Sequence, residues 1–176
     1  MTVLTRIPQN TNPLQATTFL LTFDRTGAVP YFCQSVNIPG VSVGQAPINF
    51  PSLDVYSPGN KITYNNLNIN FMVDEGMVGW QNLHDWFRSI ADPTSFDVRN
   101  SLTKQQNATK STKLQQYSDG SLTLLSNLNN PLLRVNFINM FPISISDIQL
   151  STQESADTVL TADASFIFMY HEFVPA

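Results

Sequence analysis

The change of hydrophobic period between residues 67 and 90 constrains the fold of this chain more than any other feature. Apolar residues occupy every second position from Leu67 to Val73, which is typical of a half-buried strand. From Trp80 onward the apolar positions lie three and four residues apart, which indicates an amphipathic helix over about residues 77–91. Pro93 ends this pattern, because the residue before a proline avoids the helical region. We therefore predict a strand followed by the one helix of the chain, with core positions Leu83, Trp86, Phe87 and Ile90.

Strand patterns dominate the rest of the chain. Residues 19–23 alternate, a turn follows at 24–27, and residues 29–36 read as the second strand of a β-hairpin. Later strands are predicted from residue 121, from residue 132 and over 162–174, the last being apolar on both faces and so expected to be central. With 176 residues the chain can bury about 70% of its unfolded surface as one domain. We predict a mainly β fold, an antiparallel sandwich or barrel-like domain with one flanking helix.

A long proline-bearing loop is predicted for residues 38–61. Proline cannot donate to a sheet ladder, so a central strand is not expected there. The segment is nevertheless too apolar for a freely solvated loop, and such a loop either folds back on its own domain or docks on another chain. Docking is the favoured reading, and its candidate interface residues are Ile48, Phe50, Leu53, Val55 and Tyr56.

Three smaller features complete the expected organisation. Residues 1–18 are polar, contain Pro8 and Pro13, and read as an extended N-terminal arm. Ile62 and Tyr64 are one residue out of phase with the strand that follows, which a bulge near Asn65 would correct. Residues 97–121 are polar with few apolar positions and are expected to form a long surface loop.

The charge content argues against several classes of function. Charged residues make up only 12% of the chain, against about 25% in average proteins, and the net charge is −4. An acidic protein without a basic face does not grip nucleic acid, although DNA can pass along such a surface. Many surfaces this poor in charge are covered by partners, and ordinary compositional drift is the alternative explanation. The sequence shows no signal peptide pattern and no apolar run long enough for a membrane span, so folding in a cytoplasm without a membrane anchor is expected.

The residues with catalytic chemistry do not form a recognisable active site. Asp74 and Glu75 could serve as an acid/base pair, but they stand where unpaired N–H groups and the helix dipole favour carboxylates, so we interpret them as the helix start cap. His84 and His171 lack a chelating partner on their own elements, and Cys33 lacks a nearby base. Phosphate-binding glycine loops and the nucleophile elbow are absent from the sequence. We predict no catalytic residue, no metal and no cofactor.

Four segments, taken in order, resemble a known family. They are FCQSVNIPG (32–40), NINFMVDE (68–75), LHDWFRSI (83–90) and FINMFPISISDIQL (137–150). Their order and spacing resemble the tail tube proteins of contractile-tailed bacteriophages. The resemblance covers roughly Phe19–Ala91 and Pro131–Phe173.

The resemblance implies a structural virion protein. Copies would form homohexameric rings whose sheets join into one inner barrel, and the rings would stack into a tube that delivers the genome. Implied partners are further copies of the chain, the tail sheath protein, baseplate and tail-terminator proteins, and genomic DNA that passes through the lumen without specific binding. The protein would reside in the virion tail after assembly in the host bacterial cytoplasm. Ring contacts would involve the 38–61 loop and the arm from Thr2 to Leu14.

Several alternatives stay open from sequence. The poorly matched segment from Val98 to Ser118 leaves room for a tube-like initiator or terminator at the baseplate or neck. Tubes of type VI secretion and of contractile bacteriocins share the implied fold. A soluble β-sandwich could bind a small ligand through Trp80 and Trp86, and a hydrolase could use Asp74 and Glu75.

Overall fold

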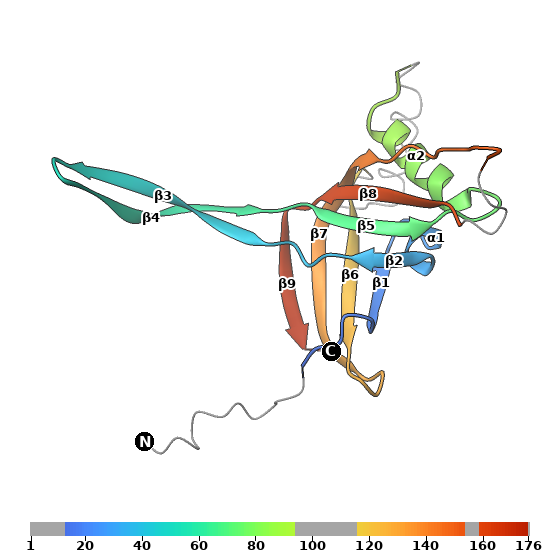
Figure 1. Ribbon diagram of the computed structural model, residues 1–176, viewed down its shortest axis with the longest axis horizontal. Coiled ribbons are helices and arrows are strands. Elements are labelled where there is room, and N and C mark those ends of the chain that lie inside the picture. Colours follow the sequence, from blue (N-terminus) through green and yellow to red (C-terminus); the bar gives the residue numbers. More distant parts are fainter. Residues whose placement is uncertain (1–12, 94–115, 154–158, 176) are drawn as a thin grey trace, which may run out of the picture.

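Strand β7 (Pro131–Ile145) joins the two sheets of the domain. The computed structural model describes residues 13–93, 116–153 and 159–175. The first part of β7 lies between two strands of one sheet, and its last part pairs with a strand of the other. Its register shifts between Pro142 and Ser144, inside that second pairing. The strands of the two sheets cross steeply in Figure 1, so one long strand serves both layers.

The first sheet contains β1 (Phe19–Phe23), β6 (Ser118–Leu125), the first part of β7 and β9 (Tyr170–Pro175), in that spatial order. Every neighbouring pair is antiparallel. Leu21 lies opposite Leu122, and Leu122 lies opposite Val135, so these side chains share one face. All three are buried. That face is the first wall of the core.

The second sheet contains β2 (Cys33–Val36), β5 (Leu67–Met72), β8 (Thr161–Ile167) and the last part of β7. Leu67, Ile69 and Phe71 are buried, while the alternate residues of β5 are exposed or half-buried. The half-buried strand predicted from the alternation of residues 67–73 is thereby confirmed.

The core lies between the sheets and is closed at one side by α2 (Val78–Ile90). Aromatic rings bridge the layers, with centroids 5.3 Å apart for Phe23 and Phe166 and 5.2 Å apart for Phe137 and Phe168. Trp86 brings α2 to within 6.0 Å of the Phe166 ring. The predicted fold class, a mainly antiparallel β domain with a flanking helix, is confirmed.

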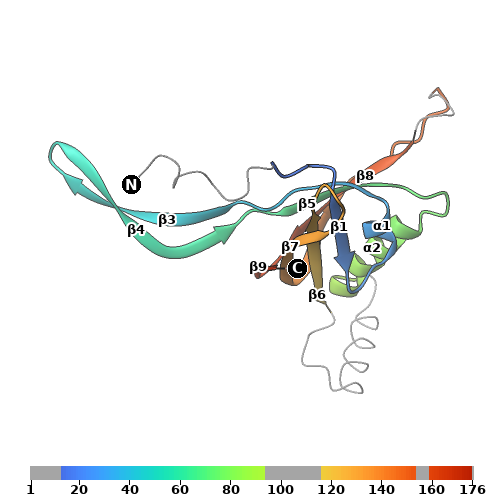
Figure 2. The ribbon, with the colours of Figure 1, turned by 90° about the horizontal axis from the view of Figure 1, so that it is seen from below.

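A two-stranded hairpin of β3 (Val41–Phe50) and β4 (Leu53–Tyr64) projects from this domain. Figures 1 and 2 show it extending far from both sheets, on the side opposite α2. The prediction of an irregular loop over residues 38–61 is therefore wrong. Among the described residues each of these strands pairs only with the other, so Pro47 and Pro58 are tolerated, because a missing N–H on the outer edge leaves the ladder intact.

The hairpin predicted for residues 19–36 is also wrong. A short helix, α1 (Ala28–Tyr31), follows the turn and buries Val29 completely. The chain thereby moves from the first sheet to the second, where β2 pairs with β5, while β1 pairs with β6. Turn residues mark a reversal of the chain but do not select the strand that becomes the partner.

Two further expectations are corrected. No bulge is needed at Asn65, because β4 ends at Tyr64 and β5 begins a new pairing at Leu67. The strand predicted over 162–174 is divided into β8 and β9, which belong to different sheets. Both pair with β7, so the apolar character of both faces comes from two strands rather than from one central strand.

The polar loop predicted for residues 97–121 ends earlier than expected. Strand β6 already begins at Ser118, and residues 97–115 lie outside the described residues. Of the predicted arm, residues 1–12 also lie outside the described residues, and residues 13–17 are exposed ahead of β1.

Candidate assembly interface

The hairpin exposes all five predicted interface residues. Exposed fractions range from 42% for Val55 to 68% for Leu53. The register places Ile48 opposite Val55 and Phe50 opposite Leu53. Because facing residues share a side and alternate residues point oppositely, these four residues form one apolar face near the tip. Tyr56, opposite Pro47, belongs to the other face.

A second apolar group lies near the base of the hairpin, outside the five predicted interface residues. Val43 faces Ile62, and Val41 faces Tyr64. Val41, Val43 and Ile62 are each more than half exposed. The alternation of residues 41–43 is the signal that could have identified the first part of this segment as strand, as the alternation of Ile62 and Tyr64 did for the second.

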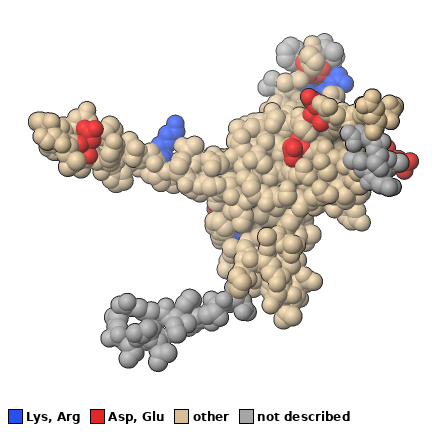
Figure 3. Space-filling model, viewed as in Figure 1, with Lys and Arg blue, Asp and Glu red and all other residues tan. Residues whose placement is uncertain are grey.

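Almost no charge interrupts these apolar residues. Asp54 and Lys61 are the two charged residues of the hairpin, and Figure 3 shows the rest of its visible face as uncharged. A two-stranded hairpin is marginally stable alone in water, and a long exposed apolar edge invites pairing with another chain. The hairpin therefore has the properties of a docking element.

Two glycines meet where the hairpin changes register. A Cβ atom added to Gly59 would lie 2.7 Å from the Gly44 carbonyl oxygen, a contact too short for any side chain. The register shift between Val43 and Gln45 occurs at the same place. Close backbone approach thus requires glycine at position 59.

The base of the hairpin is fixed to the first sheet by aromatic contacts. The Tyr64 ring lies 5.6 Å from Phe168 and 5.0 Å from His171, and Phe137 and Phe173 also contact that imidazole. The Asn65 N–H donates to the Gly40 carbonyl at 2.9 Å. His171 therefore packs as an aromatic residue, and burial lowers its pKa.

The carboxylate of Asp74 accepts hydrogen bonds at the start of α2. The N–H groups of Val78 and Gly79 donate to it at 3.0 and 3.2 Å. These bonds, that of Gly79 first, hold the pKa of Asp74 below its ordinary value. The residue at the N-cap position itself is Met77, in the left-handed conformation with φ of 53°. Asp74 therefore satisfies the helix start from three residues upstream, while Glu75 is exposed.

The predicted core positions of α2 differ in burial. Leu83 and Trp86 are fully buried, Ile90 packs against the core from its edge, and Phe87 is half-buried. The Trp86 Nε1–H donates to the Gln116 carbonyl at 2.9 Å. The sequence interpretation missed Ser89, which is buried and accepts a hydrogen bond from Arg25 at 3.1 Å.

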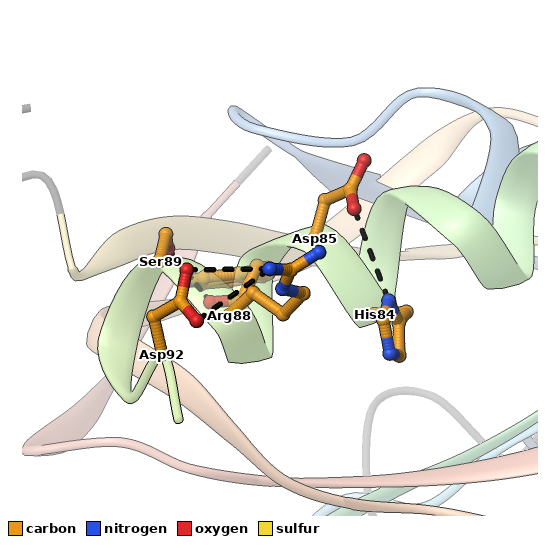
Figure 4. A network of polar contacts seen from close by, with 6 residues as sticks. His84, Asp85, Arg88, Ser89 and Asp92 are labelled. Carbon is orange, nitrogen blue, oxygen red and sulfur yellow. Dashed lines mark hydrogen bonds and ion pairs between the residues drawn. The ribbon is translucent and has the colours of Figure 1, made fainter. Parts of the chain in front are cut away.

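Apart from buried Ser89, the charged and imidazole side chains of α2 lie at its surface. Figure 4 shows His84 near Asp85, at 3.8 Å, and Arg88 paired with Asp92 at 3.4 Å. The His84 and Asp85 side chains are largely exposed. Within the described residues, no three potential metal ligands come together. Burial raises the pKa of Cys33 to about 11, so its thiol is a poor nucleophile.

The two alternative sites considered from sequence are not supported by this geometry. Trp86 is buried in the core, and Trp80 is half-buried and stacked on His84, so the tryptophans form no open binding platform. The Asp74 carboxylate accepts hydrogen bonds from the N–H groups of Val78 and Gly79, and Glu75 is exposed, which favours the cap over an acid/base pair.

A groove of about 510 Å³ runs beside the free edge of β1. Phe19, Leu21 and Phe23 of β1 contribute to its lining, together with Pro30 and Tyr31 of α1 and Cys33 of β2. At the opposite edge of the first sheet, β9 exposes 53% of Phe173. The domain therefore has an apolar hollow at one edge of the sheet and an apolar side chain at the other.

A family model for phage tail tube proteins matches residues 5–174. The chain belongs to this tail tube family. Members are structural tube proteins, so a role as a structural component of a phage tail follows, and the family is not one of enzymes. Comparison with curated protein sequences gave no match.

Solved structures show the tail tube fold at low sequence identity. A chain of the anti-feeding prophage tube terminating cap has a TM-score of 0.63 at 13% identity over 100% of both chains. A chain of the sheath–tube complex of the PVC extracellular contractile injection system, in its extended state, has a TM-score of 0.60 at 14% identity over 94% of each chain. A chain of the sheath/tube terminator of that system has a TM-score of 0.61 at 15% identity, covering 93% of this tail tube protein and 97% of that chain.

Neither helix in the described part of this tail tube protein has the length and apolarity that crossing a bilayer requires.

Proposed function

We propose that this tail tube protein forms hexameric rings that stack into the inner tube of a contractile phage tail and conduct the genome. The observation that carries the proposal is the projecting hairpin, whose apolar side chains its own domain leaves exposed. The tail tube fold and family support the same proposal. The free edges of the first sheet, β1 and β9, could pair between neighbouring copies and close the ring.

Strand direction favours edge-to-edge joining of the first sheet. Its four strands alternate in direction from β1 to β9, so β9 of one copy and β1 of the next can run antiparallel. Joining these edges would continue the alternation around a closed ring. Closure removes free strand edges, which otherwise promote uncontrolled association.

Phe173 and the groove beside β1 are complementary parts of that lateral contact. Phe173 lies opposite Val135, so it points to the core side of the first sheet, although it stands at the edge and is half exposed. The groove beside β1 is lined from both faces of that strand, by Phe19 and Phe23 on the core side and by Leu20 and Thr22 on the other. A neighbouring Phe173 entering it would extend the apolar core across the subunit boundary, and full burial of such a side chain contributes about 1.5–3 kcal/mol.

The hairpin would then provide the contact between rings. The apolar face formed by Ile48, Phe50, Leu53 and Val55 is far from the edges of the first sheet, which supports a contact between stacked rings. Each of these side chains contributes about 1.5–3 kcal/mol when fully buried, which compensates for the marginal stability of a two-stranded hairpin. The arm from Thr2 to Leu14 is the second proposed stacking segment.

The proposed partners outside the tube are the sheath, the baseplate and the tail terminator. The similarity to chains of a sheath–tube complex and of a sheath/tube terminator supports these assignments. A net charge of −4 supports passage of DNA without specific binding. We place the assembled protein in the virion tail, with assembly in the host cytoplasm.

A tube-terminating role is the second candidate. It is favoured by the similarity to the tube terminating cap, which extends over the whole of both chains. Such a paralogue would use the same lateral contacts but would stack on one side only. An initiator at the baseplate would share that property.

Electron microscopy of the purified protein tests the proposal. Tubes of uniform diameter and variable length support the main tube subunit, whereas single or paired rings at every concentration support a terminator or initiator. A protein that stays monomeric at high concentration would overturn ring assembly.

A further inference from the structure

The face of the first sheet that points away from the core is ordered into rows by the strand register. Core-side residues alternate with residues of the opposite face along each strand. One row across the four strands consists of Thr22, Ser121, Asn136 and Glu172, and the next consists of Leu20, Thr123, Arg134 and Val174. We call these eight residues the open face.

Side-chain contacts and exposure agree with this register. The hydroxyls of Thr22 and Ser121 lie 2.7 Å apart, which places them on the same side of adjacent strands. Thr22, Arg134 and Glu172 are exposed, whereas the core-side residues Leu21 and Val135 are buried. Thr123 is the exception on the open face, since only 7% of it is exposed. The open face is therefore distinct from the wall that packs on the second sheet.

One cation and one anion dominate the charge of the open face. Arg134 lies opposite Val174, and Glu172 lies opposite Asn136, so the two charges are diagonal neighbours on adjacent strands, roughly 7–8 Å apart at the backbone. The other carboxylate on these four strands, Asp119, accepts the Asn139 N–H at 3.0 Å. Most other open-face side chains are small and uncharged.

We propose that the open face lines the bore of the ring, and that Glu172 balances Arg134 so that a passing polyanion is not held. The inference rests on the proposed ring assembly. Its geometric reason is that the second sheet, α2 and the hairpin all lie on the other side of the first sheet or beyond its edge. When the first sheet closes into a barrel, these bulky layers need the larger outer circumference, which turns the open face inward.

The charge balance matters because a ring repeats every charge. A ring of arginines alone would attract phosphates and release counterions, which is how basic surfaces retain nucleic acid. A glutamate beside each arginine cancels most of this attraction at the distance of a phosphate. The uncharged hydroxyl and amide groups can then keep the bore wetted without fixing a cargo.

The position of the open face is tested by labelling rings at single cysteines. In a Cys33→Ala background, Arg134→Cys and the α2 control Gln81→Cys are each coupled to a small gold–maleimide particle and viewed down the ring axis. We expect gold at the centre for Arg134→Cys and at the rim for Gln81→Cys. Gold at the rim for both variants would overturn the bore assignment, and the absence of rings would overturn the proposed function beneath it.

The charge balance is tested with a fluorescent single-stranded oligonucleotide as the polyanion. Wild-type tubes at low ionic strength should retain little of it after sedimentation, and Glu172→Gln tubes should retain severalfold more, with the excess removed by salt. The matched control is Glu75→Gln, which removes the same charge from an exposed residue near α2. Equal retention by the two variants, or no increase for Glu172→Gln in intact tubes, would overturn the charge-balance proposal while leaving ring assembly untouched.

Discussion

The ring of Tyr64, at the last position of β4, lies 5.0 Å from the imidazole of His171 in β9. This contact connects the base of the projecting hairpin to the edge strand of the first sheet. Stacking and lateral contacts, as proposed, therefore depend on elements that touch within one subunit. The aromatic surroundings also make the imidazole sensitive to protonation.

Mild acid should destabilise the subunit through His171. Burial holds its folded-state pKa below the ordinary value of 6.5, so the unfolded chain binds the proton first. The contribution of this residue is present above pH 6.5 and is lost as the pH falls from there to the lowered pKa. Thermal unfolding between pH 8 and pH 5 should show this loss, and His171→Phe should flatten the curve over that window. An unchanged pH dependence in His171→Phe would contradict the assignment.

A charge on the apolar tip of the hairpin should block stacking without unfolding the subunit. Phe50→Asp and Val55→Asp place a carboxylate among side chains that would be buried between rings. We expect rings but no tubes in electron micrographs, with far-UV circular dichroism unchanged, since exposed substitutions usually alter stability by about 0.5 kcal/mol or less. The control Gln45→Asp adds the same charge on the other face and should still form tubes. Loss of the β signal in Phe50→Asp would instead assign the hairpin to the core.

Removing the edge aromatic should weaken the ring itself. Phe173→Asn replaces the side chain proposed to enter the neighbouring groove, whereas Val174→Asn makes the same replacement one residue later, where the side chain points to the opposite face. Sedimentation velocity should show monomers for the first variant and rings for the second. Rings in both would contradict the proposed role of Phe173.

Loss of the Asp74 carboxylate should destabilise α2. Asp74→Ala leaves the N–H groups of Val78 and Gly79 without their acceptor and should lower the melting temperature by about a few degrees. Glu75→Ala removes an equal charge and should have little effect. The contribution of Asp74 is present above the ordinary carboxyl pKa and disappears as the pH falls through its lowered value. Equal melting temperatures for the two variants would exclude the cap.

Truncation of a buried α2 residue should cost more than any of these surface changes. Leu83 is fully buried, and a Leu→Ala change in a core typically lowers the free energy of unfolding by about 2–5 kcal/mol. Urea denaturation of Leu83→Ala measures this loss, with exposed Gln81→Ala as the reference. A loss no greater than that of Gln81→Ala would show that α2 does not close the core.

Local patterns in the sequence predicted the elements whose burial repeats with a simple period. The alternation from Leu67 to Val73 corresponds to β5, and the spacing of Leu83, Trp86 and Ile90 corresponds to the packed side of α2. Both are set by neighbours along the chain, because strand and helix geometry fix which residues share a face. The apolar residues of the 38–61 segment likewise identified the candidate interface, though not its hairpin structure.

The sequence by itself determined the β-rich class and the position of α2. It also determined which apolar residues are available for the domain core and for the exposed surface of the hairpin. Only the tertiary structure decided which strands pair, that β7 serves two sheets, and that Phe173 and the groove beside β1 occupy opposite edges. It also decided that Arg134 and Glu172 share a face. The physical reason is that strand partners are selected by contacts between distant residues, which local periodicity does not encode.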